Sequence, residues 1–170
     1  MAKQVTVKGI QGLSRKLKAL GIDVGRKTEQ AAVAGGLILQ NGMKQRAPRR
    51  TRNLARSIHI GGHEDQAPDF STGGERRGKN QVPAPERSKN RVKIYIGTNL
   101  IYAAIQEYGG EIRPRRAAFL RFQIDSEWVM ARRVRIPAQP YVRPTFEADG
   151  PEAQREVGEA LRDIIRAAVK

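Results

Sequence analysis

The chain contains no cysteine, so disulfide bonds and thiolate ligands are excluded. Aromatic side chains are also few, with one Trp, four Tyr and four Phe in 170 residues, which leaves little for a platform that stacks single-stranded bases. The longest uncharged apolar run covers residues 31–40, about half of the roughly 20 residues that a membrane span needs. The first residues lack the apolar centre of a signal peptide. We expect a soluble protein that is used without export and without contact with a membrane.

Acidic residues are scarce in the first third of the chain. Residues 1–60 hold thirteen Lys and Arg against two acids (13 − 2 = +11), whereas residues 61–170 hold nineteen against fifteen (19 − 15 = +4). Such asymmetry is typical of contact with nucleic acid or with an acidic protein surface. A solvated basic face is the alternative interpretation.

Three segments have the pattern of helices. Apolar residues at spacings of three and four predict an amphipathic helix over residues 10–20. A second helix is predicted from Asp23, as N-cap, to about Arg46, and its small apolar centre suits a position between other elements or between subunits. The last helix is predicted from Pro151 to Val169, with the proline at the first helical position.

Four segments have the pattern of strands: residues 54–62, 91–98, 118–125 and 128–136. The short link at Asp125-Ser126 predicts an antiparallel hairpin between the last two. Between the second and third of these segments, residues 99–110 predict a short helix that is capped by Thr98 or Asn99 and stopped by Gly109. Residues 61–90 show almost no periodicity and predict a long flexible or arm-like loop.

This order of elements predicts one domain over residues 1–170 with an α+β fold. Its sheet would be small, mixed or antiparallel, and made of about four strands, with helices packed on it.

Patterns of catalytic or cofactor chemistry are weak. The stretch "GGERRGKN" has the spacing of a phosphate-binding loop, but no apolar strand precedes it and no helix can follow it. His59 and His63 have helical spacing for a metal on a segment that is predicted as strand and turn. No serine lies in a nucleophile elbow. We expect no catalytic, cofactor or metal site.

Arginine clusters are the clearest candidate binding features. The first contains Arg49, Arg50 and Arg52, and the second contains Arg115 and Arg116. The arginine side chain presents a planar fork of donors that suits phosphate and carboxylate groups. Contact with passing DNA or with an acidic subunit face is the functional interpretation of both clusters, and a solvated loop is the alternative.

Three stretches together resemble a known family. "RAPRRTRNLARSIHI" is similar to an "AP-x-x-T-G-x-L-x-x-S-I" segment, "IYIGTNLIYAAIQEYGG" to a "VGTN-x-x-YA-x-x-x-E-x-GT" segment, and "IPAQPYVRPTFEA" to an "AQPFLRPAL" segment. The three segments occur in this order in the tail-component family of long-tailed bacteriophages, the tail completion or neck proteins of lambdoid phages. Asn53 stands where the family has glycine, after Arg52, and Gly110 replaces the usual threonine.

The resemblance implies a structural protein of the virion without catalysis, assembled in the host cytoplasm. It implies a ring of identical subunits, six being favoured over twelve, that completes the tail tube and joins it to the head connector or stopper, with possible contact to DNA in the channel. It also implies a layout similar to that of tail-terminator proteins. The matching positions, expected to fix turns and subunit contacts, are Thr51, Leu54, Ser57, Gly97, Thr98, Asn99, Tyr102, Glu107, Gly109, Gln139, Pro140, Arg143 and Pro144.

The residues predicted to contact another subunit or partner combine both arguments. They are Arg49, Arg50, Arg52, Leu54, Thr98, Asn99, Tyr102, Glu107, Tyr108, Arg115, Arg116, Tyr141 and Arg143. The alternative function is a free nucleic-acid-binding protein that uses the basic N-terminal third. The two hypotheses differ in assembly and in the salt dependence of DNA binding.

Overall fold

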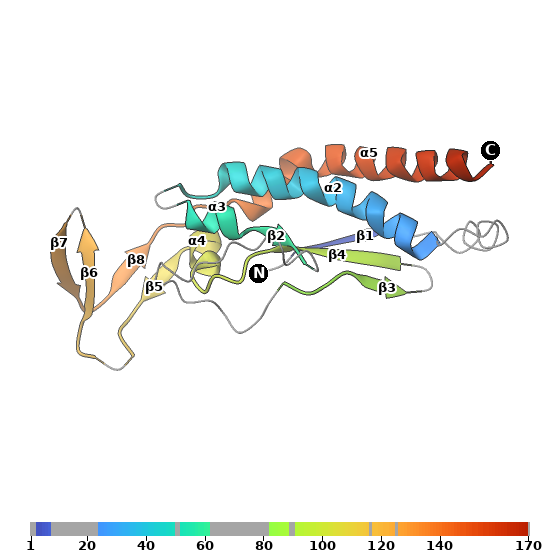
Figure 1. Cartoon of the computed structure of the whole chain (residues 1–170). Helices are drawn as coiled ribbons and strands as arrows, with labels where there is room; N and C mark the ends of the chain where they lie inside the picture. Colours follow the sequence, from blue (N-terminus) through green and yellow to red (C-terminus); the bar gives the residue numbers. More distant parts are fainter. Residues whose placement is uncertain are drawn as a thin grey trace.

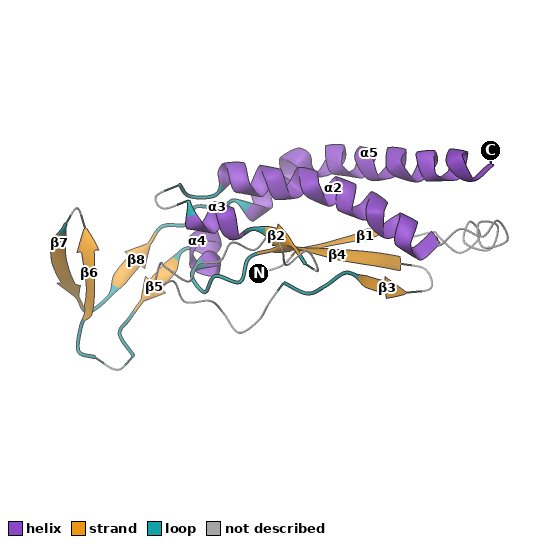
Figure 2. Cartoon of the chain, viewed as in Figure 1, coloured by secondary structure: helices purple, strands orange, loops and turns teal. Residues whose placement is uncertain are grey.

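Two long helices lie one above the other on a small sheet, and an extended pair of strand ladders projects from one end (Figure 1). The computed structural model describes residues 3–7, 24–49, 52–61, 82–88, 91–115, 117–124 and 126–169. The helix expected over residues 10–20 and the cap at Asp23 lie outside these residues. The combination of helices with small antiparallel sheets confirms the α+β class (Figure 2).

Helix α2 (Val24–Arg46) forms the middle layer, between helix α5 (Val142–Val169) and the sheet. Its glycines allow this close packing on two sides. A Cβ on Gly35 would lie 2.5 Å from Val157 Cγ2 on α5, and a Cβ on Gly36 would lie 2.5 Å from Ile94 Cδ1 in the sheet. The expectation that this helix lies between other elements is therefore confirmed.

The main sheet is built around strand β4 (Arg91–Gly97), and all of its pairings are antiparallel. Strand β1 (Lys3–Val7) covers one edge of β4. On the other edge, β2 (His59–Ile60) pairs with the end of β4 and β3 (Glu86–Ser88) pairs with its beginning. Along β4 the alternate residues Val92, Ile94 and Ile96 are buried, as the period of two predicts.

Two expectations next to this sheet are wrong. Residues 54–62 do not form one strand, because helix α3 (Asn53–Ser57) precedes the two-residue β2. Leu54 and Ser57 are both buried at a helical spacing of three. Most of the loop expected over residues 61–90 lies outside the described residues, but its end contains β3, whose three side chains are polar and exposed and give no apolar alternation in the sequence.

Helix α4 (Ala103–Tyr108) follows β4 and ends at Gly109, whose positive φ of 68° suits glycine. The expected cap at Thr98 or Asn99 is wrong, because the residue before the helix is Tyr102 and no side chain caps it. Thr98 instead closes a turn of its own, since its Oγ1 accepts the N–H of Leu100 at 3.2 Å.

Residues 110–136 form the projecting part, which we call the arm. Strand β5 (Gly110–Ile112) pairs with β8 (Val134–Ile136), and β6 (Leu120–Ile124) pairs with β7 (Glu127–Ala131). The predicted hairpin is confirmed. The single strand expected over residues 128–136 is wrong, because the chain breaks at Arg132-Arg133 and its two halves pair with different partners. The main sheet has four strands, as expected, but the hairpin strands are not among them.

Helix α5 begins nine residues before the expected start at Pro151. An internal proline costs a helix about 3 kcal/mol because it removes one hydrogen bond and its ring clashes with the preceding turn. Packing offsets that cost here, since Ala153 and Val157 just beyond the proline are buried in the interface with α2. Across the described residues, neither this helix nor any other has the length and apolar content to span a membrane.

Candidate interaction surfaces

The three stretches that carry the family resemblance meet at one joint inside the subunit. The first and second are linked by Ser57 Oγ and Thr98 Oγ1, which lie 2.6 Å apart and are buried. The second and third are linked by the backbone N–H of Gln139, which donates to the carbonyl of Gln106 at 2.7 Å. The spacing of the motifs in the sequence therefore reflects a tertiary contact.

The hydroxyl groups at this joint form a directed chain. Ser57 donates its proton to the carbonyl of Leu54 at 2.7 Å, so the hydroxyl of Thr98 must donate to Ser57. Thr98 in turn accepts the N–H of Leu100. Each hydroxyl is both donor and acceptor, an arrangement that strengthens every bond in the chain.

Replacing Thr98 with valine keeps the side-chain shape but removes the central hydroxyl of this chain. The buried N–H of Leu100 then loses its acceptor, and we expect the free energy of unfolding to fall by about 1–3 kcal/mol. Urea denaturation of the variant and of Asn99→Ala, a neighbouring half-buried residue, measures this loss. Equal stability of Thr98→Val and the unchanged chain would contradict the assigned bonding.

Glu107 on α4 holds the first turn of α5. Its Oε2 accepts the backbone N–H groups of Tyr141 and Val142 at 2.7 and 2.8 Å, and its Oε1 accepts that of Arg143 at 3.0 Å. The following residue, Pro144, has no N–H to satisfy. A carboxylate thus occupies the position where a helix N-terminus has unpaired donors and partial positive charge.

The environment of Glu107 keeps its carboxylate ionised. Burial acts to raise the pKa, but the N–H groups of Val142, Arg143 and Tyr141 outweigh it and the pKa is lowered. Burial, followed by the charge of Glu107, raises the pKa of the Tyr141 phenol. The charge at this joint is therefore a fixed anion.

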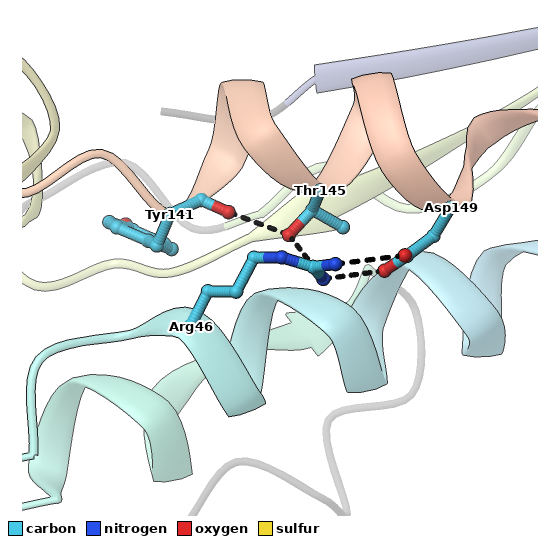
Figure 3. A network of polar contacts seen from close by, with 4 residues as sticks. All are labelled: Arg46, Tyr141, Thr145 and Asp149. Carbon is cyan, nitrogen blue, oxygen red and sulfur yellow. Dashed lines mark hydrogen bonds and ion pairs between the residues drawn. The ribbon is translucent and has the colours of Figure 1, made fainter.

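A second polar network joins the end of α2, at Arg46, to Thr145 and Asp149 near the start of α5 (Figure 3). Arg46 donates to both carboxylate oxygens of Asp149, at 2.7 and 3.0 Å, and lies 3.5 Å from Thr145 Oγ1. Thr145 donates to the carbonyl of Tyr141. The hydrogen bond to Asp149 raises the pKa of Arg46. Together with the Glu107 contacts, these bonds fix the start of α5 at two points.

The first arginine cluster borders a basic hollow with a volume of about 430 Å³ at the end of α2. It is lined by Asn41, Lys44, Gln45, Arg49, Arg52 and Ala55. Arg49 and Arg52 are exposed, and burial lowers the pKa of Lys44. Arg52 adopts a left-handed conformation with φ of 57°, which turns the chain from α2 into α3. Three positively charged side chains, Lys44, Arg49 and Arg52, therefore border the hollow.

The structure separates the remaining predicted contact residues by exposure. Leu54, Thr98, Glu107 and Tyr141 are buried and serve the joint within the subunit. Asn99 and Tyr102 are half-buried. Tyr108, Arg115 and Arg143 are exposed. Arg50 and Arg116 lie outside the described residues.

A further candidate surface was missed by the sequence reasoning. Large apolar side chains are exposed on the arm, with Trp128 at 61% and Met130 at 63% of full exposure. Phe119, Ile124 and Ile112 are also exposed there. The alternation of apolar residues in both hairpin strands was visible, but it was read as the mark of half-buried strands in the sheet. Their exposed fractions show that the described chain does not bury them, although the guanidinium of Arg121 lies 4.3 Å from the centre of the Trp128 ring and that of Arg132 lies 5.6 Å from the centre of the Phe119 ring.

Metal-ligating residues do not gather in the described part of the chain, where no three His, Asp or Glu side chains are placed to hold an ion. His59 is buried and its Nδ1 donates to the carbonyl of Ser57 at 2.8 Å. That carbonyl can only accept, so the bond sets the tautomer of the imidazole.

In the described chain, polar groups hold the helices together, and basic and large apolar side chains are exposed on the surface. A model of the family described as "Bacteriophage HK97-gp10, putative tail-component" matches residues 11–109, which is 99 of the 170 residues. The chain therefore belongs to the HK97-gp10-like family of bacteriophage tail components. Comparisons with curated proteins and with solved structures give no match.

Proposed function

We propose that the protein is a structural subunit of the head–tail junction, where a ring of identical copies completes the tail tube and joins it to the head connector or stopper. Membership of a tail-component family supports a structural role in the virion tail. The observation that carries the proposal is the set of eight large apolar side chains that are exposed on the described surface. Exposed apolar groups in such number are typical of surfaces that become covered in an assembly.

The joint described above supplies the rigidity that a ring subunit needs. Glu107 and Arg46 hold α5 against α4 and α2, so the outward face of α5 keeps a constant position relative to the rest of the subunit. Six copies are favoured by analogy with tail-terminator proteins, and a ring of twelve copies that would match the symmetry of a portal is the alternative. Assembly takes place in the host cytoplasm before the tail joins the head.

The basic hollow is proposed to receive an acidic surface of a neighbouring ring. Lys44, Arg49 and Arg52 line it, and the partial burial of Lys44, which lowers its pKa, leaves its charge less solvated than that of an exposed lysine. A carboxylate entering the hollow would offset that loss of solvation. Arginine forks at its border give such a contact a defined orientation.

Reversing the charge of the hollow tests this role. We expect Arg49→Glu combined with Arg52→Glu to block the joining of tails to heads, because carboxylates would repel the acidic partner. Complementation of a phage that lacks the protein, with electron microscopy of the particles, measures the defect. The control is Lys27→Glu, which reverses the charge of one exposed side chain near the other end of α2. Normal virion numbers with a correctly folded double variant would contradict the role.

Nucleic-acid binding is the second candidate function, and the same basic hollow is the observation that favours it. A free DNA-binding protein should bind duplex DNA with an affinity that falls steeply as salt rises. A ring protein need not bind DNA alone and should associate with tail-tube or connector protein. The mass of the purified protein, alone and mixed with those proteins, distinguishes the two when it is combined with a DNA titration at two salt concentrations.

A further inference from the structure

The β6–β7 hairpin is apolar on both of its faces. Residues directly opposite in an antiparallel pair share a face, so Phe122 and Val129 lie on one side with Leu120 and Ile124. Trp128 and Met130 lie on the other, and the guanidinium of Arg121 sits 4.3 Å from the centre of the Trp128 ring. Apolar residues on both faces are typical of strands that are covered on both sides.

Within the described chain, the hairpin pairs with no further strand and packs on no helix. Two isolated strands are only marginally stable in water. The arm also carries an excess of positive charge, with seven arginines against three acids in residues 110–136 (7 − 3 = +4). The surface that covers it should therefore combine apolar area with acidic groups.

Helix α5 offers such a surface. Glu152, Glu156, Glu159 and Asp163 follow at spacings of four, three and four, which places them along one side of the helix, and all four are exposed. Among the described residues, Asp163 alone of these four has an ion pair, with Arg166 at 3.5 Å. We call this set the acidic stripe. Like charges four residues apart repel, and arginines of the same helix, Arg155, Arg162 and Arg166, offset part of this charge.

An open hollow lies beside the acidic stripe. It has a volume of about 800 Å³ and is lined by Pro151, Gln154, Arg155, Gly158, Glu159 and Arg162. A Cβ on Gly158 would meet no atom within 4 Å, unlike one on Gly35. A glycine inside a helix costs about 1 kcal/mol relative to alanine. No packing contact among the described residues requires glycine at position 158. The close approach of a bulky side chain from another molecule would require it.

The arm and the acidic stripe lie at opposite ends of the molecule, so they cannot meet within one chain (Figure 1). Contact between two different surfaces of identical subunits is head-to-tail, and such contacts form a ring when the rotation from copy to copy closes and an open filament when it does not. Residues 142–169 hold six acids and four arginines (4 − 6 = −2), a charge opposite to that of the arm. A second copy of the chain therefore carries the surface that the arm needs.

We propose that the arm of each copy lies across the acidic stripe and the adjoining hollow of α5 on the next copy, with Trp128 entering the hollow at Gly158. This inference rests on the proposed ring. Arg121 and Arg132 meet the carboxylates of the stripe. Each subunit then contributes its arm to one neighbour and its acidic stripe to the other.

Site-specific crosslinking tests the contact directly, and the absence of cysteine leaves no background thiol. Gln123→Cys lies on the exposed arm and Arg155→Cys lines the hollow. Assembled protein, formed alone or with tail-tube and connector proteins, is treated with a short bismaleimide. A mixture of the two single variants should give crosslinked dimers, and the double variant should give a ladder that ends at the copy number of the ring. Gln123→Cys mixed with Lys27→Cys is the matched control.

Charge exchange provides the second test. Arg121→Glu with Arg132→Glu should weaken assembly at least tenfold, and added Glu156→Arg and Glu159→Arg should restore most of it. A ring that forms without crosslinks above the control, or with the arm crosslinked to tail-tube protein, would overturn this contact and leave the proposed function intact. Failure to assemble under every condition would overturn both. Undiminished assembly of the charge-reversed arm would overturn the contact alone.

Discussion

Replacing Glu107 with alanine is expected to lower the free energy of unfolding by about 3–5 kcal/mol, because three backbone N–H groups lose their acceptor. Two of these donors, on Tyr141 and Val142, belong to buried residues, where a missing partner is most costly. The change also removes the anion from the positive end of α5. Guanidinium denaturation followed by circular dichroism measures the loss.

Two further variants separate the charge from the shape of Glu107. Glu107→Gln keeps one acceptor oxygen but places an amide against N–H donors, so we expect a loss close to that of alanine. Glu111→Ala is the control, since Glu111 is exposed and bonds only to arginine side chains. A loss below about 1 kcal/mol for Glu107→Ala would refute the role of the carboxylate in holding α5.

The lowered pKa of Glu107 gives this contribution a definite pH dependence. A carboxyl whose pKa is lower in the folded than in the unfolded state contributes fully above the unfolded value of about 4.3. The contribution is lost as pH falls from there through the folded pKa, because the group must then take up a proton. Stability measured from pH 6 down to pH 3 should therefore fall less steeply in Glu107→Gln than in the unchanged protein.

Replacing Gly35 with alanine should destabilise the protein by about 2–3 kcal/mol although alanine favours a helix. The new Cβ would lie 2.5 Å from Val157 Cγ2 and 2.6 Å from the carbonyl oxygen of Ala153. The backbone carbonyl cannot rotate away as a side chain can, so α2 and α5 must separate. Thermal and urea denaturation of the purified chain measure the effect.

Gly158→Ala is the matched control for this prediction. It makes the same change in a helix interior where a Cβ meets no described atom, and it should raise the free energy of unfolding by about 0.5–1 kcal/mol. If both glycine variants change stability in the same direction, the packing of α2 against α5 through Gly35 is not as the structure has it.

Both predictions concern the position of α5, and assembly should be sensitive to them. Helix α5 carries the acidic stripe, and its start is fixed by Glu107 and by Arg46 with Asp149. A variant that loosens these contacts moves α5, and with it the acidic stripe on which the arm of the next copy is proposed to lie. Loss of assembly in a folded Glu107 variant would then reflect a displaced helix rather than a lost contact with the partner.

Local patterns predicted the elements whose burial follows a simple period. The alternation of Val92, Ile94 and Ile96 predicted β4, the small residues around Gly35 predicted a helix between two layers, and the Asp125-Ser126 link predicted the hairpin. These features depend on neighbours in the chain. The three motif stretches pointed to a tail component through their resemblance to that family, which the family match bears out.

Patterns failed where a distant contact overrides the local preference. Pro151 marks a helix start in the sequence, but packing against α2 carries α5 through it. Arg132-Arg133 interrupts an apparently continuous strand, because the two halves pair with β6 and β5. Leu54 and Ser57 lie in a stretch whose sequence resembles a strand, but both residues belong to helix α3. They are buried at a helical spacing of three, and the Ser57 hydroxyl donates to the Leu54 carbonyl.

Two features followed directly from the chain: the basic N-terminal third, from composition, and the positions of α2 and β4, from local periodicity. The class of protein followed from the resemblance of the three motif stretches to a known family. Tertiary structure alone decided what the motif residues do. Glu107 is thirty-four residues from Tyr141 in sequence and reaches its N–H only after α4 and α5 pack together. The exposure of Trp128 and Met130 was decided in the same way, since burial depends on which surfaces meet and not on which residues alternate.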